Sequence, residues 1–125
     1  MNNHIDNYID CCINSEGSHY DVSVVTFEIL KDNYKYDTDN IWKYKNNEDW
    51  VIDDKNTRLK LDIKTTIVNT FLSRSQYWSD NKPPDNNPNI ICDNELKSLK
   101  LLKISNKIRD DKFISQLIKE IKQFY

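Results

Sequence analysis

The spacing of apolar positions changes along the chain, and this change predicts an α+β fold. Between residues 19 and 32, apolar side chains recur every three or four positions, which predicts a helix. Several of them are β-branched, so a strand is the alternative for this segment. From Asn33 onward the pattern alternates in short aromatic or β-branched runs separated by Asn- and Asp-rich turns. Such runs predict a small antiparallel hairpin or meander with strands at 34–36, 41–45 and 50–52.

The second half of the chain returns to helical spacing. Three helices are expected, each after an aspartate that can cap its first turn: 63–78 after Asp62, 93–106 from Asp93, and a last helix after Asp110. A Pro- and Asn-rich loop at 79–92 separates the first of these from the other two. The expected order is therefore α-β-β-β-α-loop-α-α, with four or so helices packed on the small sheet.

The domain organisation expected from this pattern is simple. A length of 125 residues fits one ordinary domain, which we place at 18–125. Ser18 followed by Asp21 three residues later fits a capping box at its first helix. Residues 1–17 form a polar N-terminal segment, in which isoleucines at a four-residue spacing are compatible with a short helix.

Two groups of side chains are candidates for binding. The helix from Asp93 carries four lysines on one stripe, which could follow a phosphate backbone: Lys97, Lys100, Lys103 and Lys107. The alternative is a solvated face opposite an apolar stripe formed by Leu96, Leu99 and Leu102 or Lys103.

The second group is aromatic. Trp42 and Tyr44 are expected on one face of their strand, with Trp50 meeting them across the turn. Such a cluster can stack on single-stranded bases, but the surrounding acidic side chains repel phosphates. We expect these rings to pack the sheet against the helices instead.

Composition and charge narrow the function classes. A single glycine, Gly17, excludes the usual glycine-rich phosphate loops of nucleotide-binding proteins. The net charge of -2 is unlike that of a DNA-coating protein, although residues 93–125 carry 8 basic and 5 acidic side chains, a net of +3. Residues 1–62 carry 7 basic and 13 acidic side chains, a net of -6. No apolar run is long enough for a membrane helix.

The sequence offers little for catalysis. No cysteine or histidine spacing fits a metal site, and we expect no cofactor and no enzyme activity. His19, at the start of a helix, is expected to pack or cap there. Three cysteines, Cys11, Cys12 and Cys92, favour free thiols in a reducing compartment.

The order of motifs resembles a known family. The helix begins at Asp21-Val22-Ser23, with Ser23 where the family usually has Ala, and is followed by these aromatic positions: Tyr34, Tyr36, Trp42, Tyr44 and Trp50. The chain then continues with Arg58-Leu59 and a helix, and ends in a pattern from Lys112-Phe113 to Phe124-Tyr125. Over residues 18–125 this is similar to a block in the primase-helicases of nucleocytoplasmic large DNA viruses, of the poxvirus type and their giant-virus relatives.

The resemblance implies a connector between a primase part and a superfamily 3 helicase motor. Such a chain would act in viral DNA replication through protein contacts or self-association, with weak DNA contact as a secondary role. It would work in the host cytoplasm or viral factory. The alternative is a small virion or scaffold protein of the same fold.

Overall fold

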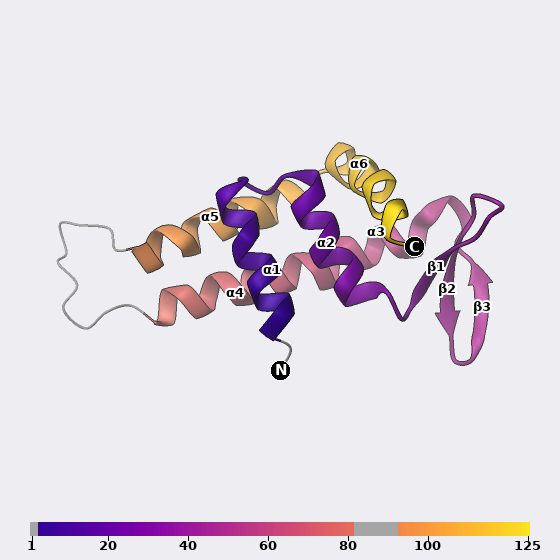
Figure 1. Cartoon of the computed structure of the whole chain (residues 1–125), viewed down its shortest axis with the longest axis horizontal. Coiled ribbons are helices and arrows are strands. Elements are labelled where there is room, and N and C mark those ends of the chain that lie inside the picture. Colours follow the sequence, from indigo (N-terminus) through magenta and orange to yellow (C-terminus); the bar gives the residue numbers. More distant parts are fainter. Residues whose placement is uncertain (1–2, 82–92) are drawn as a thin grey trace.

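The computed structural model describes residues 3–81 and 93–125, and it confirms the α+β class. Two helices precede a three-stranded sheet, and the remaining helices follow it (Figure 1). The elements are α1 (Asn3–Asn14), α2 (His19–Leu30), β1 (Tyr34–Tyr36), β2 (Trp42–Asn46), β3 (Asp49–Ile52), α3 (Thr57–Asp62), α4 (Val68–Asp80), α5 (Asp93–Ile108) and α6 (Asp111–Ile121). The Pro- and Asn-rich segment lies largely outside the described residues, and Ser79 and Asp80 of the expected loop belong to α4.

The helices pack around the pair formed by α4 and α5, which lie side by side along the long axis of the molecule (Figure 1). Helix α1 contacts α2, α4 and α5, while α6 packs on α2. The sheet sits at one end, beside α3 (Figure 1).

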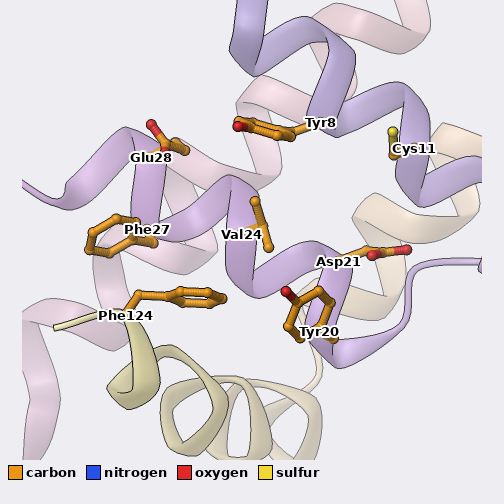
Figure 2. A pocket seen from close by; sticks show the side chains of 8 residues that line it. All are labelled: Tyr8, Cys11, Tyr20, Asp21, Val24, Phe27, Glu28 and Phe124. Carbon is orange, nitrogen blue, oxygen red and sulfur yellow. The ribbon is translucent and has the colours of Figure 1, made fainter.

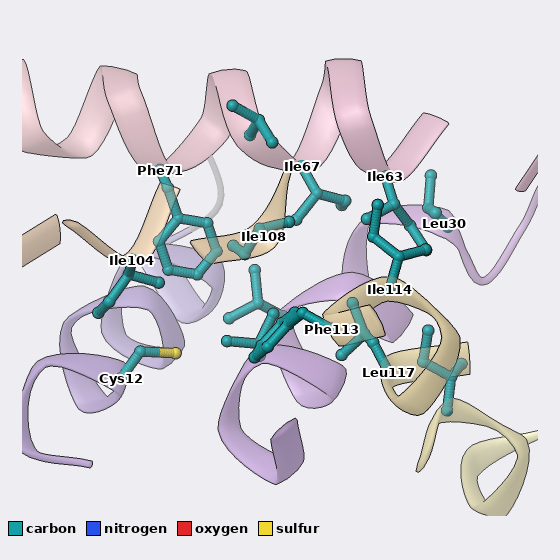
Figure 3. Packing of buried hydrophobic residues seen from close by; sticks show 14 of the residues in the cluster. Cys12, Leu30, Ile63, Ile67, Phe71, Ile104, Ile108, Phe113, Ile114 and Leu117 are labelled. Carbon is teal, nitrogen blue, oxygen red and sulfur yellow. The ribbon is translucent and has the colours of Figure 1, made fainter. Parts of the chain in front are cut away.

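The core joins these helices, and α1 contributes to it. Ile9 and Cys12 of α1 are buried, so residues that the sequence set apart as a polar segment pack with the rest of the chain. Figure 3 shows Phe71 of α4 between side chains of α5 and of the N-terminal helices, with Phe113 and Leu117 of α6 nearby. Burial of such side chains is the main favourable term in folding.

The sheet is antiparallel in the order β1-β2-β3, and its register corrects one expectation. Asn46 pairs with Asp49 across a tight turn, which places Trp50 opposite Lys45. Successive side chains of a strand alternate between faces, so Trp50 lies on the face opposite Trp42 and Tyr44. The prediction that Trp50 meets these two rings is wrong, because the two-residue turn shifts it by one position.

Helix starts follow the expected caps in two of three checkable cases. The Ser18 hydroxyl accepts a hydrogen bond from the Asp21 N–H at 3.2 Å, and the Asp110 carboxylate accepts one from the Phe113 N–H at 3.1 Å. Asp62 is not a cap: it lies inside a helical segment and accepts a hydrogen bond from the Tyr34 hydroxyl.

The long helix after the sheet begins at Thr57, six residues before the predicted start. The buried carboxylate of Asp53 accepts hydrogen bonds from the N–H groups of Arg58 and Leu59, both at 2.8 Å. The segment then passes from α3 through one π-helical turn (Ile63–Ile67) into α4. A π turn holds one extra residue, and it therefore rotates the next helical turns about the axis.

Candidate functional site

The predicted basic stripe on α5 is divided by the fold. Lys97 turns toward α4, with its Nζ 4.2 Å from the centre of the Trp78 ring. The other three lysines line a hollow of about 320 Å³, the lysine hollow, together with Glu16 and Ile104: Lys100, Lys103 and Lys107. Three of the four predicted residues are therefore brought together, and Lys97 is not among them.

The turn between α1 and α2 closes one side of the lysine hollow. Gly17 has φ 76°, and a Cβ there would lie 2.9 Å from Cγ1 of Ile104. Only glycine permits so close an approach at positive φ. This approach brings the Glu16 carbonyl oxygen to 3.4 Å from Nζ of Lys107. The lysine hollow thus combines three ammonium groups with one carboxylate side chain, a mainly anion-attracting arrangement.

The three aromatic candidates do not form one surface: Trp42 is part of the core, and Trp50 lies on the other face of the sheet. Trp42 is buried, with its ring 5.1 Å from that of Tyr125 and 5.0 Å from that of Tyr36. Tyr44 stands on the same face and has the Arg58 guanidinium 5.1 Å from its ring centre. Trp50 is exposed on the other face of the sheet, beside Nζ of Lys35. The interpretation that these rings pack the sheet against the helices is confirmed for Trp42 and is wrong for Trp50, which is exposed on the other face. No shared stacking platform forms from these three rings.

A second opening was not predicted from the sequence. It is a groove of about 430 Å³ between α1, α2 and the C-terminal turn, the aromatic groove, lined by Tyr8, Cys11, Tyr20, Asp21, Val24, Phe27, Glu28 and Phe124 (Figure 2). Four of these side chains are aromatic and two are acidic.

The rings of the aromatic groove come from three parts of the chain. Tyr8 projects from α1 on one side, while Tyr20, Phe27 and Phe124 stand on the other, with Val24 between (Figure 2). The ring centres of Phe27 and Phe124 are 5.5 Å apart, and those of Tyr20 and Phe124 are 6.0 Å apart. Tyr20 remains 51% exposed, so the rings present accessible apolar surface.

The carboxylates of the aromatic groove come from one helix. Asp21 and Glu28 are seven residues apart on α2, which corresponds to two turns and about 10.5 Å along the axis. Glu28 is paired with Lys31 at 3.1 Å, an exposed contact of the kind that contributes little energy. The candidate residue Asp21 therefore has two roles: its N–H is capped by Ser18, and its side chain lines the aromatic groove.

The sequence indicates the α2 side of the aromatic groove but not the side formed by Phe124. Tyr20, Val24 and Phe27 recur at helical spacing on α2, opposite the buried face that holds Val22 and Val25. Phe124 reaches the aromatic groove only because the C-terminal turn packs beside α2, and the spacing of apolar residues in the sequence does not predict that contact.

The apolar stripe expected on α5 is on the wrong side of the helix. The buried residues are Leu101, Ile104, Ser105 and Ile108. Leu96, Leu99 and Leu102 are 44%, 47% and 42% exposed. The prediction failed because two overlapping stripes of apolar residues share this helix, and the packing of α4 and α6 selects the other one.

These three leucines adjoin the lysines on the outer side of α5. Leu96 precedes Lys100 by four positions, and Leu99 precedes Lys103 by four, so each pair shares a helical row. We call this surface the leucine–lysine face; it consists of Leu96, Leu99, Lys100, Leu102 and Lys103.

Titratable side chains elsewhere have structural roles. The His19 ring stacks on Phe113 with ring centres 4.4 Å apart, which confirms the expected packing role. Burial raises the pKa of the Cys12 thiol to about 12, and this thiol donates to the Tyr8 carbonyl oxygen at 3.4 Å. Within residues 3–81 and 93–125, no group of three His, Cys, Asp or Glu side chains is placed to hold a metal ion. Over the same residues, no helix is both long and apolar enough to span a bilayer.

Comparison with known proteins gives no further guide. No family model matches the chain, and neither curated proteins nor solved structures give a significant match.

Proposed function

We propose that this chain is a non-catalytic interaction domain that binds a protein partner through the aromatic groove. The observation that carries the proposal is the set of accessible rings there, with Tyr20 51% and Tyr8 36% exposed. Aromatic side chains in a concave surface, rimmed by polar groups, are typical of binding sites for proteins. The resemblance of residues 18–125 to a primase-helicase connector supports a replication partner in the host cytoplasm or viral factory.

The test is co-elution with the primase-helicase encoded by the same genome. A Tyr8→Ser/Tyr20→Ser variant removes two exposed rings from the aromatic groove, and Ile52→Ser, an exposed apolar residue on the sheet, is the matched control. We expect wild type and the control to bind, and the aromatic-groove variant to bind at least about tenfold more weakly. Equal binding by all three proteins, or binding by none, would overturn the proposal.

A weaker contact with nucleic acid is a second candidate, and the lysine hollow favours it. Three ammonium groups that converge on one opening can neutralise phosphates of a passing strand. The test is fluorescence anisotropy of labelled single- and double-stranded DNA with wild type and with Lys100→Glu/Lys103→Glu/Lys107→Glu. We expect binding at low salt with a log–log slope of about -2 to -3 on duplex DNA, lost in the variant. No binding at low salt would refute this candidate.

A further inference from the structure

Two surfaces of opposite character lie exposed on the described part of the chain. The aromatic groove offers rings with two carboxylates, Asp21 and Glu28. The leucine–lysine face of α5 offers three leucines, each more than 40% exposed, beside ammonium groups. Scattered exposed leucines are common, but three in neighbouring rows of one helix form a patch.

We infer that the occupant of the aromatic groove is the leucine–lysine face of a second copy of this chain. This inference rests on the proposed function and names the partner of the same site. The contact joins unlike surfaces, so that copies associate head to tail.

The spacing of charges on the two helices agrees. Asp21 and Glu28 stand seven residues apart on α2, and Lys100 and Lys107 stand seven apart on α5. Two α-helices packed nearly parallel or antiparallel place residues at this interval at matching heights, about 10.5 Å apart. Lys100 and Lys107 both line the lysine hollow, but Lys107 already reaches the Glu16 carbonyl oxygen, so Lys100 is the lysine with more freedom to pair.

The apolar parts also match. Val24 lies between the carboxylates of α2, flanked by Tyr20 and Phe27. Leu99 directly precedes Lys100 on α5, just as Tyr20 directly precedes Asp21 on α2, so a nearly parallel arrangement that aligns the charges brings Leu99 to the height of Tyr20. Leucine side chains packed between aromatic rings bury apolar area that is exposed in the single chain.

The choice of a second copy rests on the chain's own charge asymmetry. Residues 1–62 carry a net of -6 and include Asp21 and Glu28, which line the aromatic groove, while residues 93–125 carry +3 and include Lys100 and Lys103 of the leucine–lysine face. Electrostatic complementarity of this kind favours association and fixes register. Phosphates would account for the lysines but not for the three exposed leucines beside them.

A contact between two different surfaces leaves one binding surface free on each copy. Each copy would use the aromatic groove on one side and retain a free leucine–lysine face on the other, so that growth continues into a ring or a filament. Sedimentation equilibrium of wild type under reducing conditions should therefore show an average mass that rises with concentration beyond that of a dimer.

One-sided variants test the contact directly. Tyr20→Asp alters only the aromatic groove, and Leu99→Asp alters only the leucine–lysine face; both side chains are about half exposed, which leaves the fold intact. We expect each variant alone to be monomeric, and an equimolar mixture to form a 1:1 heterodimer and nothing larger. Leu61→Asp, at a leucine that is 55% exposed on α3, is the matched control and should behave as wild type.

Charge reversal provides a second test that leaves the apolar surfaces unchanged. Glu28→Lys and Lys100→Glu should each weaken self-association by about tenfold, and an equimolar mixture of the two should recover part of it.

The outcomes separate this inference from the proposed function. A wild-type chain that stays monomeric at several hundred micromolar overturns the inference, whereas Tyr20-dependent capture of the primase-helicase would still uphold the function. Self-association that Tyr20→Asp abolishes and Leu99→Asp does not also overturns it, because another surface would then occupy the aromatic groove. Loss in both variants without a heterodimer in the mixture would likewise exclude the head-to-tail contact.

Discussion

Arg74 of α4 and Asp10 of α1 form a two-pronged ion pair across 64 residues of sequence. The guanidinium donates from Nε to Oδ1 at 3.0 Å and from Nη2 to Oδ2 at 2.7 Å. The Trp78 indole N–H donates to the same carboxylate at 3.0 Å. These hydrogen bonds to Asp10 raise the pKa of Arg74 above its ordinary value. The network fastens the N-terminal helix, and with it one wall of the aromatic groove, to the centre of the molecule.

Breaking this pair should loosen α1. We expect Arg74→Ala to lower the free energy of unfolding by about 2–3 kcal/mol, because it leaves a half-buried carboxylate with fewer donors. Arg74→Lys should recover only part of this, since an ammonium cannot reproduce the two parallel hydrogen bonds. Urea denaturation measures the loss. Equal stability of Arg74→Ala and wild type would show that the pair contributes nothing.

The tryptophans of the sheet should differ sharply in their effect on stability. Trp42 is 3% exposed, so Trp42→Ala should lower the free energy of unfolding by about 3–5 kcal/mol. Trp50 is 38% exposed, and Trp50→Ala should change it by less than about 1 kcal/mol. Trp42→Phe should be milder than Trp42→Ala, because Phe keeps a buried ring and leaves a smaller cavity, while both variants remove an indole N–H that has no acceptor among the described residues. Comparable losses for Trp42→Ala and Trp50→Ala would contradict the observed register.

The cap of the helical segment after the sheet should reside in Asp53 alone. Asp53→Ala removes the acceptor of two N–H groups and should lower the free energy of unfolding by about 2 kcal/mol. Asp54→Ala, one position further on at an exposed side chain, is the control and should be nearly neutral. Thermal unfolding followed by circular dichroism compares the two. A larger loss of stability in Asp54→Ala than in Asp53→Ala would show that Asp53 is not the capping residue.

The adjacent thiols should react at very different rates. In a Cys92→Ser background, Cys11 is exposed and should react with an aromatic disulfide reagent at pH 8, while buried Cys12 should react only as the chain unfolds. Fast reaction of both thiols in the folded chain would contradict the burial of Cys12.

The raised pKa of Cys12 also has a consequence for stability at high pH. The folded chain keeps this proton up to pH about 12, whereas the unfolded chain releases it near pH 9.0. The free energy of unfolding therefore falls as pH rises through this interval, and Cys12→Ala should reduce the slope. Denaturation curves at several pH values above 9 measure it, and an unchanged slope in Cys12→Ala would contradict the assignment.

Helix caps and strands depend on residues that are close in sequence, so the sequence predicts most of them. Ser18 and Asp110 cap their helices as expected, because a cap is a local hydrogen bond between residues three positions apart. The aromatic runs and polar turns predict the three strands, because a strand and its turn are also set by neighbouring residues.

Features that depend on packing between distant parts of the chain could not be predicted from the sequence. Asp53 caps a helix whose apolar repeat becomes clear only later in the sequence, so the pattern favours Asp62 as the cap instead. On α5, leucines at 96, 99 and 102 imitate a core stripe, and only the placement of α4 and α6 decides that the stripe at 101, 104 and 108 is the buried one. The aromatic groove needs Phe124 beside α2, a contact between parts of the chain almost one hundred residues apart.

The π turn at Ile63–Ile67 sets the rotational phase of α4. Buried residues along this segment recur at intervals of four, at Leu59, Ile63, Ile67, Phe71 and Ser75, where an ideal α-helix would drift about 40° at each step. The wide turn absorbs part of that drift. Deleting one residue there would leave a more regular helix but rotate Arg74 by about 100°, away from Asp10. The number of residues in this segment is therefore more strictly determined than their identity, and we expect the segment to tolerate a substitution far better than a deletion.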